Sequence, residues 1–347
     1  MRDIENHRII LKQNPNPHIL VWGRSGSGKT YYCYRKIEEA FEEGKRVLIL
    51  DYSGSYNDKE MQKANFKYIE QTMVFDATNN PFTWVGTYDD DELFQSDLSD
   101  AFLAVLNISS YFQKKWMRKV ISYHMKTHDS INFIDFIHSL ENLYQICIEE
   151  NTHKEDAKNI QRLLTRFSPY ESIDGISFKN QKNFERANIP IVILQLSSFA
   201  ETERKFLSNL FITLFWKEIV RYNPGKRADL LLLDEFQNLS LSSNGAFCSI
   251  LREGRRYDIA LLLSTQFISN YKKEQIESLL QAGNIFIFQP TPTDLKFSAK
   301  IINAEDSEVW IKILKNLQKG EAILKGHYIL EKISSRELTT PIICKIE

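Results

Sequence analysis

The chain has 347 residues, enough to bury a full α/β core with one helical insertion. Its 44 Lys and Arg residues nearly balance its 45 Asp and Glu residues, which excludes a basic surface over the whole protein, so any nucleic-acid surface must be local. The 4 cysteines form no CxxC pair and no run approaches about 20 apolar residues, which argues against a disulfide framework, a zinc ribbon and a membrane span. We therefore expect a cytoplasmic protein with no membrane partner.

The first predicted element is an apolar strand at 18–22, followed by a glycine-rich turn and a helical stretch. The turn has the Walker A spacing, with Gly23, Gly28, Lys29 and Thr30 at the fixed positions. Backbone N–H groups of such a turn point at phosphate oxygens, the lysine adds a charge, and the threonine hydroxyl is a ligand for Mg²⁺. A glycine turn with an incidental lysine is the weaker alternative, because a strand precedes the turn and a helix follows it. The expected nucleotide-binding residues are Gly23, Arg24, Ser25, Gly26, Ser27, Gly28, Lys29, Thr30 and Tyr31.

Further apolar runs follow, as expected for strands buried on both faces of a parallel sheet. They lie at 47–56, 73–77, 189–199, 228–236, 258–267 and 284–290. Helical patterns fall between them, notably at 201–222 and 243–256. Strands that alternate with helices predict an α/β fold with a mainly parallel sheet.

The segment from Asp91 to Ser168 differs, because it carries helical periodicity and no strand signal. We interpret it as an all-helical insertion between two halves of the sheet. Phe112, Trp116 and Tyr123 are spaced for the core of this insertion rather than for stacking on bases.

A second motif ends the apolar strand in the segment LLLLDEFQNL, at 230–239. This is a Walker B pattern, in which Asp234 can hold Mg²⁺ through its water shell and Glu235 can polarise an attacking water. An acidic pair that closes a buried strand is the alternative, and the Walker A motif upstream disfavours it. A protein that only binds nucleotide does not need the second carboxylate, so hydrolysis is the better interpretation.

Three arginines and a glutamine follow in the segment ILREGRRYDIALLLSTQ. Gln266 ends the strand next to Walker B, where an amide can contact the γ-phosphate or the attacking water. Arg252, Arg255 and Arg256 precede that strand and could reach the nucleotide of a neighbouring subunit. By spacing alone, a solvated helix end that complements the helix dipole is the more common explanation of the three arginines.

These features divide the chain into three parts. Residues 1–90 are the first part of the core with Walker A, and residues 91–178 are the helical insertion. Residues 179–347 are the second part of the core, with Walker B, the arginine cluster and a hairpin expected at 319–330.

Several segments together resemble one known family. They are WGRSGSGKT, VLILDYSGSY, NPF at 80–82, LLLLDEFQNL, REGRRYDIALLLSTQ, NIFIFQPTPTDLKF and LQKGEAILKG, in that order. With them the chain, from about Asn16 to its end, resembles the HerA/FtsK superfamily of P-loop ATPases, and most closely its HerA-type branch. The Arg-Glu-Gly-Arg segment before a strand that ends in Gln is the most specific part.

The resemblance implies a RecA-like P-loop NTPase core that assembles as a ring, usually a hexamer, with ATP between subunits and DNA in the pore. It assigns the site roles to Lys29, Thr30, Asp234, Glu235 and Gln266. It also assigns an arginine finger to the arginine cluster, with Arg255 favoured over Arg252 and Arg256.

Two departures from the family pattern stand out. The turn after the second strand has Ser55 where such proteins often have glutamate, which removes an acidic side chain from that corner. The few residues before the first strand are also too short for the N-terminal β-barrel of archaeal HerA-type proteins.

The resulting expectation is an Mg²⁺-dependent ATPase that acts as a hexameric ring motor on double-stranded DNA, as a translocase or helicase, with a nuclease or other effector as a candidate partner. One alternative is a cytoplasmic ATPase that energises conjugation or type IV secretion. Another is a nucleotide-gated scaffold for an effector complex. DNA stimulation of ATP hydrolysis separates the motor from both.

Overall fold

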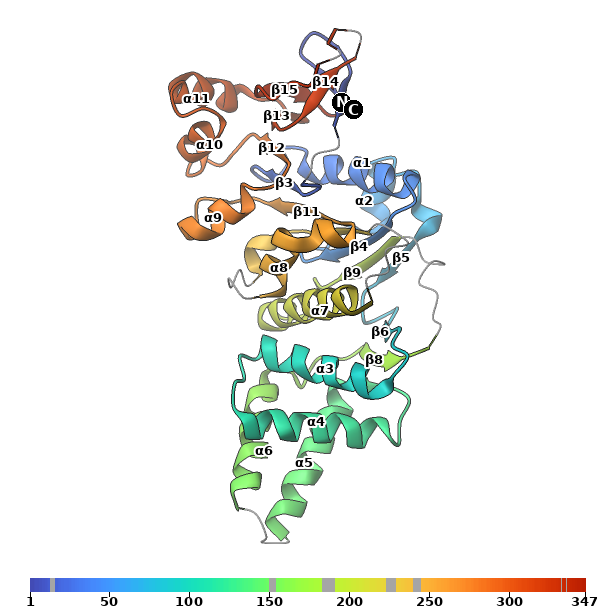
Figure 1. Ribbon diagram of the computed structural model, residues 1–347. Coiled ribbons are helices and arrows are strands. Elements are labelled where there is room, and N and C mark those ends of the chain that lie inside the picture. The colour runs from blue at the N-terminus through green and yellow to red at the C-terminus, as the bar shows by residue number, and fades with distance from the viewer. Residues whose placement is uncertain are drawn as a thin grey trace. The chain divides into compact units, whose positions relative to one another are not determined.

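The computed structural model divides into two units, which Figure 1 draws in one ribbon. The first comprises Met1–Met73, Ile189–Ile193 and Pro224–Glu347, and the second Val74–Asn188 and Leu194–Asn223. The described residues are 1–12, 16–149, 154–182, 191–222, 229–239, 245–331, 333–334 and 336–347.

A large sheet organises the first unit. Its strand order is β1-β15-β13-β12-β3-β11-β10-β4-β9-β5. The strands are β1 (Arg2–Asp3), β3 (Ile19–Trp22), β4 (Arg46–Asp51), β5 (Thr72–Phe75), β9 (Ile191–Gln195), β10 (Asp229–Leu233), β11 (Ile259–Thr265), β12 (Asn284–Phe288), β13 (Glu321–Lys325) and β15 (Ile342–Lys345). The pairs β4–β10, β10–β11, β11–β3 and β3–β12 are parallel, and β12–β13, β13–β15 and β15–β1 are antiparallel. The prediction of an α/β fold with a mainly parallel sheet is confirmed.

The central strands end together at one edge of the sheet. Every residue of β10 and β11 is buried, which is why both read as continuous apolar runs. Leu233 of β10 pairs with Leu50 and Leu263, and Trp22 pairs with Thr265, so the carboxyl ends of four strands are in register. Ligands of open α/β sheets bind outside these carboxyl ends.

The helices of the first unit cover the two faces of the sheet (Figure 1). The connection from β3 through α1 (Lys29–Glu42) to β4 passes over β11 and β10, whereas the connection from β10 through α8 (Ala246–Glu253) to β11 runs in the reverse direction. Because such crossovers are right-handed, α1 and α8 lie on opposite faces. The other helices are α2 (Asp58–Lys63), α9 (Lys273–Leu279), α10 (Leu295–Ile302) and α11 (Ser307–Asn316).

The expected C-terminal hairpin at 319–330 is wrong. Both edges of β13 are occupied, by β12 and β15, so β13 cannot pair with β14 (Tyr328–Leu330). Strand β14 pairs instead with β2 (Ile9–Leu11), far away in the sequence. In a sequence, two short strands joined by a turn resemble a hairpin. The residues around them do not show that each strand pairs with a strand far away in the chain.

The second unit is mainly helical. Its helices are α3 (Asp91–Val105), α4 (Tyr111–Met125), α5 (Phe133–Glu149), α6 (Lys154–Phe167) and α7 (Glu201–Tyr222). The ring of Phe102 lies at the centre of its core, with centroids 5.6 to 5.8 Å from the rings of Phe133, Phe136, Phe167 and Phe178. A small sheet of β6 (Phe82–Gly86), β8 (Ile176–Asn180) and β7 (Ile131–Asn132) accompanies the helices, which the helical periodicity did not indicate.

The aromatic residues of α4 do not all enter this core. Trp116 is buried at 9% exposure, as predicted, but Phe112 and Tyr123 are 52% and 62% exposed. The prediction was wrong for these two because they lie on the solvent-facing side of the helix, while Met117, Trp116 and Val120 occupy the buried side.

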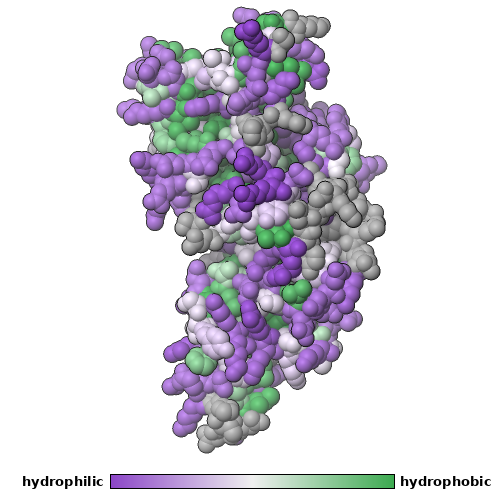
Figure 2. Space-filling model, in the orientation of Figure 1, coloured by the Kyte–Doolittle hydropathy of each residue, from purple (hydrophilic) through white to green (hydrophobic). Residues whose placement is uncertain are grey.

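Figure 2 shows that the visible face is mainly hydrophilic. Among the described residues, no helix combines the length and the apolar character needed to cross a membrane.

Candidate active site

The glycine-rich turn leaves β3 and enters α1 with two glycines in conformations that need them. Gly23 and Gly28 have φ values of 155° and 112°. A Cβ atom at Gly23 would lie 2.7 Å from Cβ of Phe288, and one at Gly28 would lie 3.0 Å from the backbone nitrogen of Gly320. The first contact leaves no room for a side chain, and the second is tight and adds to the cost of the positive φ at Gly28, so the turn lies close against two neighbouring segments.

Gly320, immediately before β13, contacts the glycine-rich turn directly. The Gly320 N–H donates a hydrogen bond to the carbonyl of Ser27 at 2.9 Å, and the Gly320 carbonyl accepts one from the N–H of Ile346 at 2.9 Å. The phosphate loop is therefore hydrogen-bonded through one residue to the C-terminal strand region.

Lys29 begins α1 and its ammonium is held inside the loop. Its Nζ donates to the carbonyls of Gly23 at 2.7 Å and Arg24 at 3.1 Å. Burial lowers the pKa of Lys29, while the carboxylates of Glu235 and Asp234 oppose this effect. The amine thus lies under the turn and within electrostatic reach of both Walker B carboxylates.

Asp234 follows β10 and is buried next to the turn after β4. Burial raises the pKa of Asp234 to about 7, the charge of Asp51 adds to this effect, and a hydrogen bond from Ser53 opposes it. A buried carboxylate of this kind is stabilised by a cation, and with the Thr30 hydroxyl at the start of α1 it offers the hard oxygen ligands that Mg²⁺ prefers. The residues present therefore fit an Mg²⁺ ion.

Asp51 shapes the turn that delivers Ser53. Its carboxylate accepts hydrogen bonds from the N–H groups of Gly54, Ser55 and Tyr56, at 2.8 to 3.0 Å. Ser53 Oγ then lies 2.6 Å from Ser55 Oγ, so the two serines occupy the corner where the family often has a glutamate. Position 55 of this turn therefore carries a hydroxyl in place of a carboxylate.

Glu235 leaves the strand in a left-handed conformation, with φ 48° and ψ 46°. A residue with a side chain adopts this conformation rarely, and it is often found at functional sites. Gln266 Nε2 donates to Glu235 Oε1 at 2.8 Å, and Gln237 Nε2 donates to Glu235 Oε2. The structure therefore brings the predicted pair Glu235 and Gln266 into direct contact.

Two further residues near Glu235 were not predicted. Gln237 contacts it directly, and the ring of Tyr271 stacks on Phe236 with centroids 5.6 Å apart. Burial and the charge of Glu235 raise the pKa of Tyr271, whose hydroxyl has no hydrogen-bond partner among the described residues. Gln237 lies within the Walker B segment and could have been suspected, whereas nothing in the sequence marks Tyr271.

The three arginines lie elsewhere. Arg252 is in the last turn of α8, and Arg255 and Arg256 are in the short helix η5 (Gly254–Tyr257) that leads into β11. All three are exposed, and none has a side-chain hydrogen bond or ion pair within the described part of the chain. Strand β11 lies between these arginines and Gln266, and at roughly 3.3 Å per residue it is about 20 Å long. Within one chain, the arginines and Gln266 therefore do not belong to the same site.

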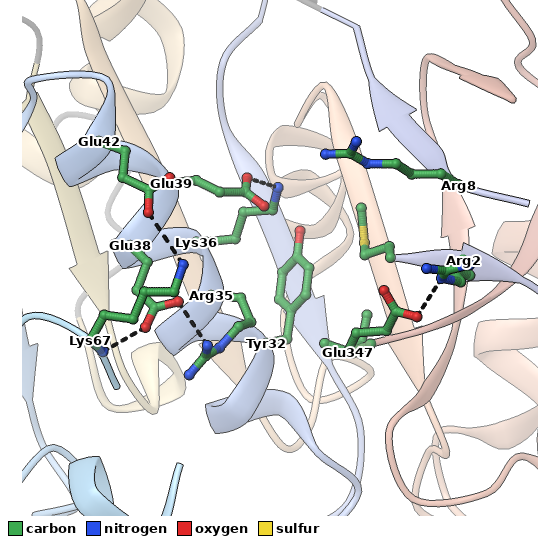
Figure 3. A pocket seen from close by; sticks show the side chains of 12 residues that line it. Arg2, Arg8, Tyr32, Arg35, Lys36, Glu38, Glu39, Glu42, Lys67 and Glu347 are labelled. Atoms are coloured by element: carbon green, nitrogen blue, oxygen red, sulfur yellow. Dashed lines mark hydrogen bonds and ion pairs between the residues drawn. The ribbon is translucent and has the colours of Figure 1, made fainter. Parts of the chain in front are cut away.

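A separate pocket of about 430 Å³ lies on the outer side of α1 (Figure 3). Most of its charged residues are paired with one another, as in Arg35–Glu38 at 2.8 Å and Lys36–Glu39 at 2.5 Å. A phosphate group would have to break such pairs to bind there. The glycine-rich turn is therefore the better phosphate site.

The glycine-rich turn lies at the carboxyl ends of the parallel strands, and the chain carries both Walker motifs. Together these features define a RecA-like P-loop ATPase fold. The sequence profile of a family described as "Helicase HerA, central domain" matches residues 8–215, more than half of the chain. This protein belongs to that family, which confirms the predicted HerA/FtsK relationship. No curated protein matches the chain in sequence.

Solved structures show the same fold. VirB4 of Thermoanaerobacter pseudethanolicus has a TM-score of 0.65 at 13% identity, and the match covers 100% of this chain and 95% of that one. The bacterial conjugative coupling protein TrwB, in its unbound form, has a TM-score of 0.64 at 13% identity, over 97% and 86% of the two chains. TrwB was also solved with a non-hydrolysable ATP analogue, at TM-score 0.65 and 12% identity, over 96% and 86%. A further TrwB structure, with ADP and Mg²⁺, has a TM-score of 0.64 at 13% identity, over 96% and 86%.

Proposed function

We propose that this protein is an Mg²⁺-dependent ATPase that works as a hexameric ring motor on double-stranded DNA. The observation that carries the proposal is the convergence of Lys29, Asp234 and Glu235 beside one phosphate loop, with Gln266 on the Glu235 carboxylate. Binding alone would not require Glu235, so this arrangement supports hydrolysis.

The nucleotide would lie on residues 23–31, with Lys29 at its β- and γ-phosphates. Thr30 and Asp234 would hold Mg²⁺, which would supply positive charge to offset the negative charge that develops on the phosphates. The complexes of TrwB with an ATP analogue and with ADP and Mg²⁺ support this choice of ligands for a related fold. Glu235 would accept a proton from the attacking water, and Gln266 would contact that water or the γ-phosphate.

The position of the arginine cluster supports a shared site. An arginine at the far end of β11 cannot serve the nucleotide of its own chain, but in a ring it could face the site of the next subunit. Arg255 is the favoured finger, with Arg252 and Arg256 as alternatives. The proposal includes residues 91–178 as an insertion between the core parts 1–90 and 179–347, and a nuclease or other effector as partner.

Membership in the HerA family supports a motor on double-stranded DNA. The dispersed cysteines support a reducing cytoplasm as the working compartment. The structural match to a conjugative coupling protein favours one alternative, an ATPase that energises conjugation or secretion. A nucleotide-gated scaffold is the third possibility, for a protein whose turnover does not respond to DNA.

The test is ATP hydrolysis by the purified protein with and without linear double-stranded DNA, with Lys29→Ala as the inactive control. Stimulation by DNA of any sequence, together with ring particles in negative-stain images, is the expected result. Hydrolysis that ignores DNA would overturn the motor and favour the alternatives. The absence of hydrolysis in the presence of Mg²⁺ and DNA would overturn the ATPase itself.

A further inference from the structure

The carboxylate of Glu235 is held on both of its oxygens by different amides. Gln266, at the end of β11, donates to Oε1 at 2.8 Å, and Gln237 donates to Oε2. Each carboxylate oxygen can accept a second hydrogen bond, so the group keeps acceptor capacity while its rotation is restricted. The left-handed backbone of Glu235 and the two amide contacts together determine the orientation of its carboxylate.

The orientation of the Gln237 amide is determined in turn by Thr265. The Thr265 hydroxyl donates to Gln237 Oε1 at 2.5 Å, and Thr265 is completely buried at the end of β11. The same hydroxyl lies 2.9 Å from the carbonyl of Phe267, which competes for its proton. The N–H₂ side of the Gln237 amide thus lies on the Glu235 carboxylate and its oxygen lies on the Thr265 hydroxyl, so both ends of the amide are held.

We propose that Gln237 is a positioning residue for ATP hydrolysis, held by Thr265 and acting through Glu235. The inference rests on the proposed role of Glu235. In the reaction the water oxygen bonds to the γ-phosphorus as the bond from phosphorus to the β–γ bridging oxygen breaks, and a water proton passes to Glu235. A base that must meet a bound water within hydrogen-bond distance gains from a fixed orientation, as in other sites where a third group orients the base.

Three variants test the relay in the full-length protein under conditions where it hydrolyses ATP. Gln237→Met keeps the length of the side chain and loses the amide, Thr265→Val loses only the hydroxyl, and Thr265→Ser keeps the hydroxyl. We expect kcat to fall on the order of ten-fold in the first two, with KM for ATP within about two-fold of wild type. This is the lower end of the roughly 10–100-fold effect of residues that orient metal ligands, which act in a comparable way. Thr265→Ser should stay near wild type. Gln161→Met, an exposed glutamine on α6, is the matched control.

To separate a positioning role from a structural effect, Gln237→Met and Thr265→Val are also introduced into Glu235→Gln, and the residual ATPase rate is measured. If Gln237 and Thr265 act only through Glu235, their substitution leaves the residual ATPase rate of Glu235→Gln unchanged. A damaged fold lowers that residual rate again. Wild-type kcat in Gln237→Met, or a second loss in the Glu235→Gln background, overturns the inference. If Gln237→Met does not fold, Thr265→Val against Thr265→Ser decides by the same criteria.

The outcomes also distinguish this inference from the proposed function. A wild-type protein without ATPase activity overturns both. Hydrolysis that needs Glu235 but is indifferent to Gln237 and Thr265 overturns only the positioning role.

Discussion

The Ser53 hydroxyl donates a hydrogen bond to Oδ2 of Asp234 at 2.6 Å. It joins the turn after β4 to the end of β10, and it is one of the few polar contacts of a buried carboxylate. Since the hydrogen bond favours the ionised form of Asp234 against burial and the charge of Asp51, Ser53 keeps this group ready for a cation.

Ser53→Ala should therefore weaken the response to Mg²⁺. Without the hydroxyl, Asp234 is more often protonated at neutral pH, so the Mg²⁺ concentration for half-maximal ATPase activity should rise by about ten-fold or more. A single hydrogen bond to a charged group, worth about 1.5–3 kcal/mol, is the basis of this expectation. Activity at saturating Mg²⁺ should recover, and a titration at fixed ATP measures both values. An unchanged Mg²⁺ requirement would contradict the role of Ser53.

The raised pKa of Asp234 also predicts a pH dependence of stability. The group holds its proton in the folded protein up to about pH 7, whereas its ordinary value is 3.8. Its contribution to the free energy of unfolding is thus fully present below about pH 4 and is lost as pH rises through about 7. Without Mg²⁺, wild type should lose more stability between pH 5 and pH 8 than Asp234→Asn, which cannot ionise. Thermal melts of both proteins across this range measure the difference, and parallel curves would refute it.

Glu235→Gln should bind ATP with Mg²⁺ about as well as wild type and hydrolyse it poorly, because an amide cannot accept the proton from water. Both hydrogen bonds to position 235 involve side-chain amides, which can also pair with an amide, so the fold should be kept. Calorimetry gives the affinity and a phosphate-release assay gives the rate. Turnover within a few-fold of wild type would show that another residue activates the water.

Arg255→Ala should bind ATP nearly normally and fail to hydrolyse it, if Arg255 reaches the site of a neighbouring subunit. An arginine finger is worth on the order of 10³–10⁵ in rate in well-studied cases. Lys29→Ala has the complementary defect, since it lacks the phosphate-binding charge and keeps the arginine. A mixture of the two proteins creates some interfaces with both parts intact, so partial ATPase activity should return.

The mixing experiment needs proof that mixed rings form, for example by co-purification of differently tagged chains. Mixed rings without any recovered activity at several ratios would contradict a finger supplied by Arg255. Full activity of Arg255→Ala alone would move the finger to Arg252 or Arg256, or leave the cluster as the solvated helix end.

Much of the candidate site could be predicted because its residues lie in short local motifs at the ends of strands. Asp51, Asp234 and Gln266 each end a buried strand, and parallel strands in register bring such ends to one edge of the sheet. The alternation of strands and helices was equally visible, since buried runs and helical periods differ over a few residues.

The rest depended on geometry that no local pattern carries. The contact between Gln237 and Glu235 exists because Glu235 turns into a left-handed conformation, which its residue type does not suggest. The partners of β13 and β14 lie far away in the sequence, so the local spacing suggested a hairpin. On α4, helical spacing did not show which side of the helix faces the solvent, and Phe112 was placed in the core for that reason.

Two backbone hydrogen bonds join Ser27 through Gly320 to Ile346, and so connect the phosphate loop to the end of β15. If ordering of the loop by a ligand slows the opening of the amides at Gly320 and Ile346, linkage requires that a partner holding the end of β15 tightens the ligand by the same free energy. Hydrogen exchange at these two amides is therefore a report on nucleotide occupancy from outside the site. A partner that grips the last strand would tune the affinity for nucleotide without touching a phosphate.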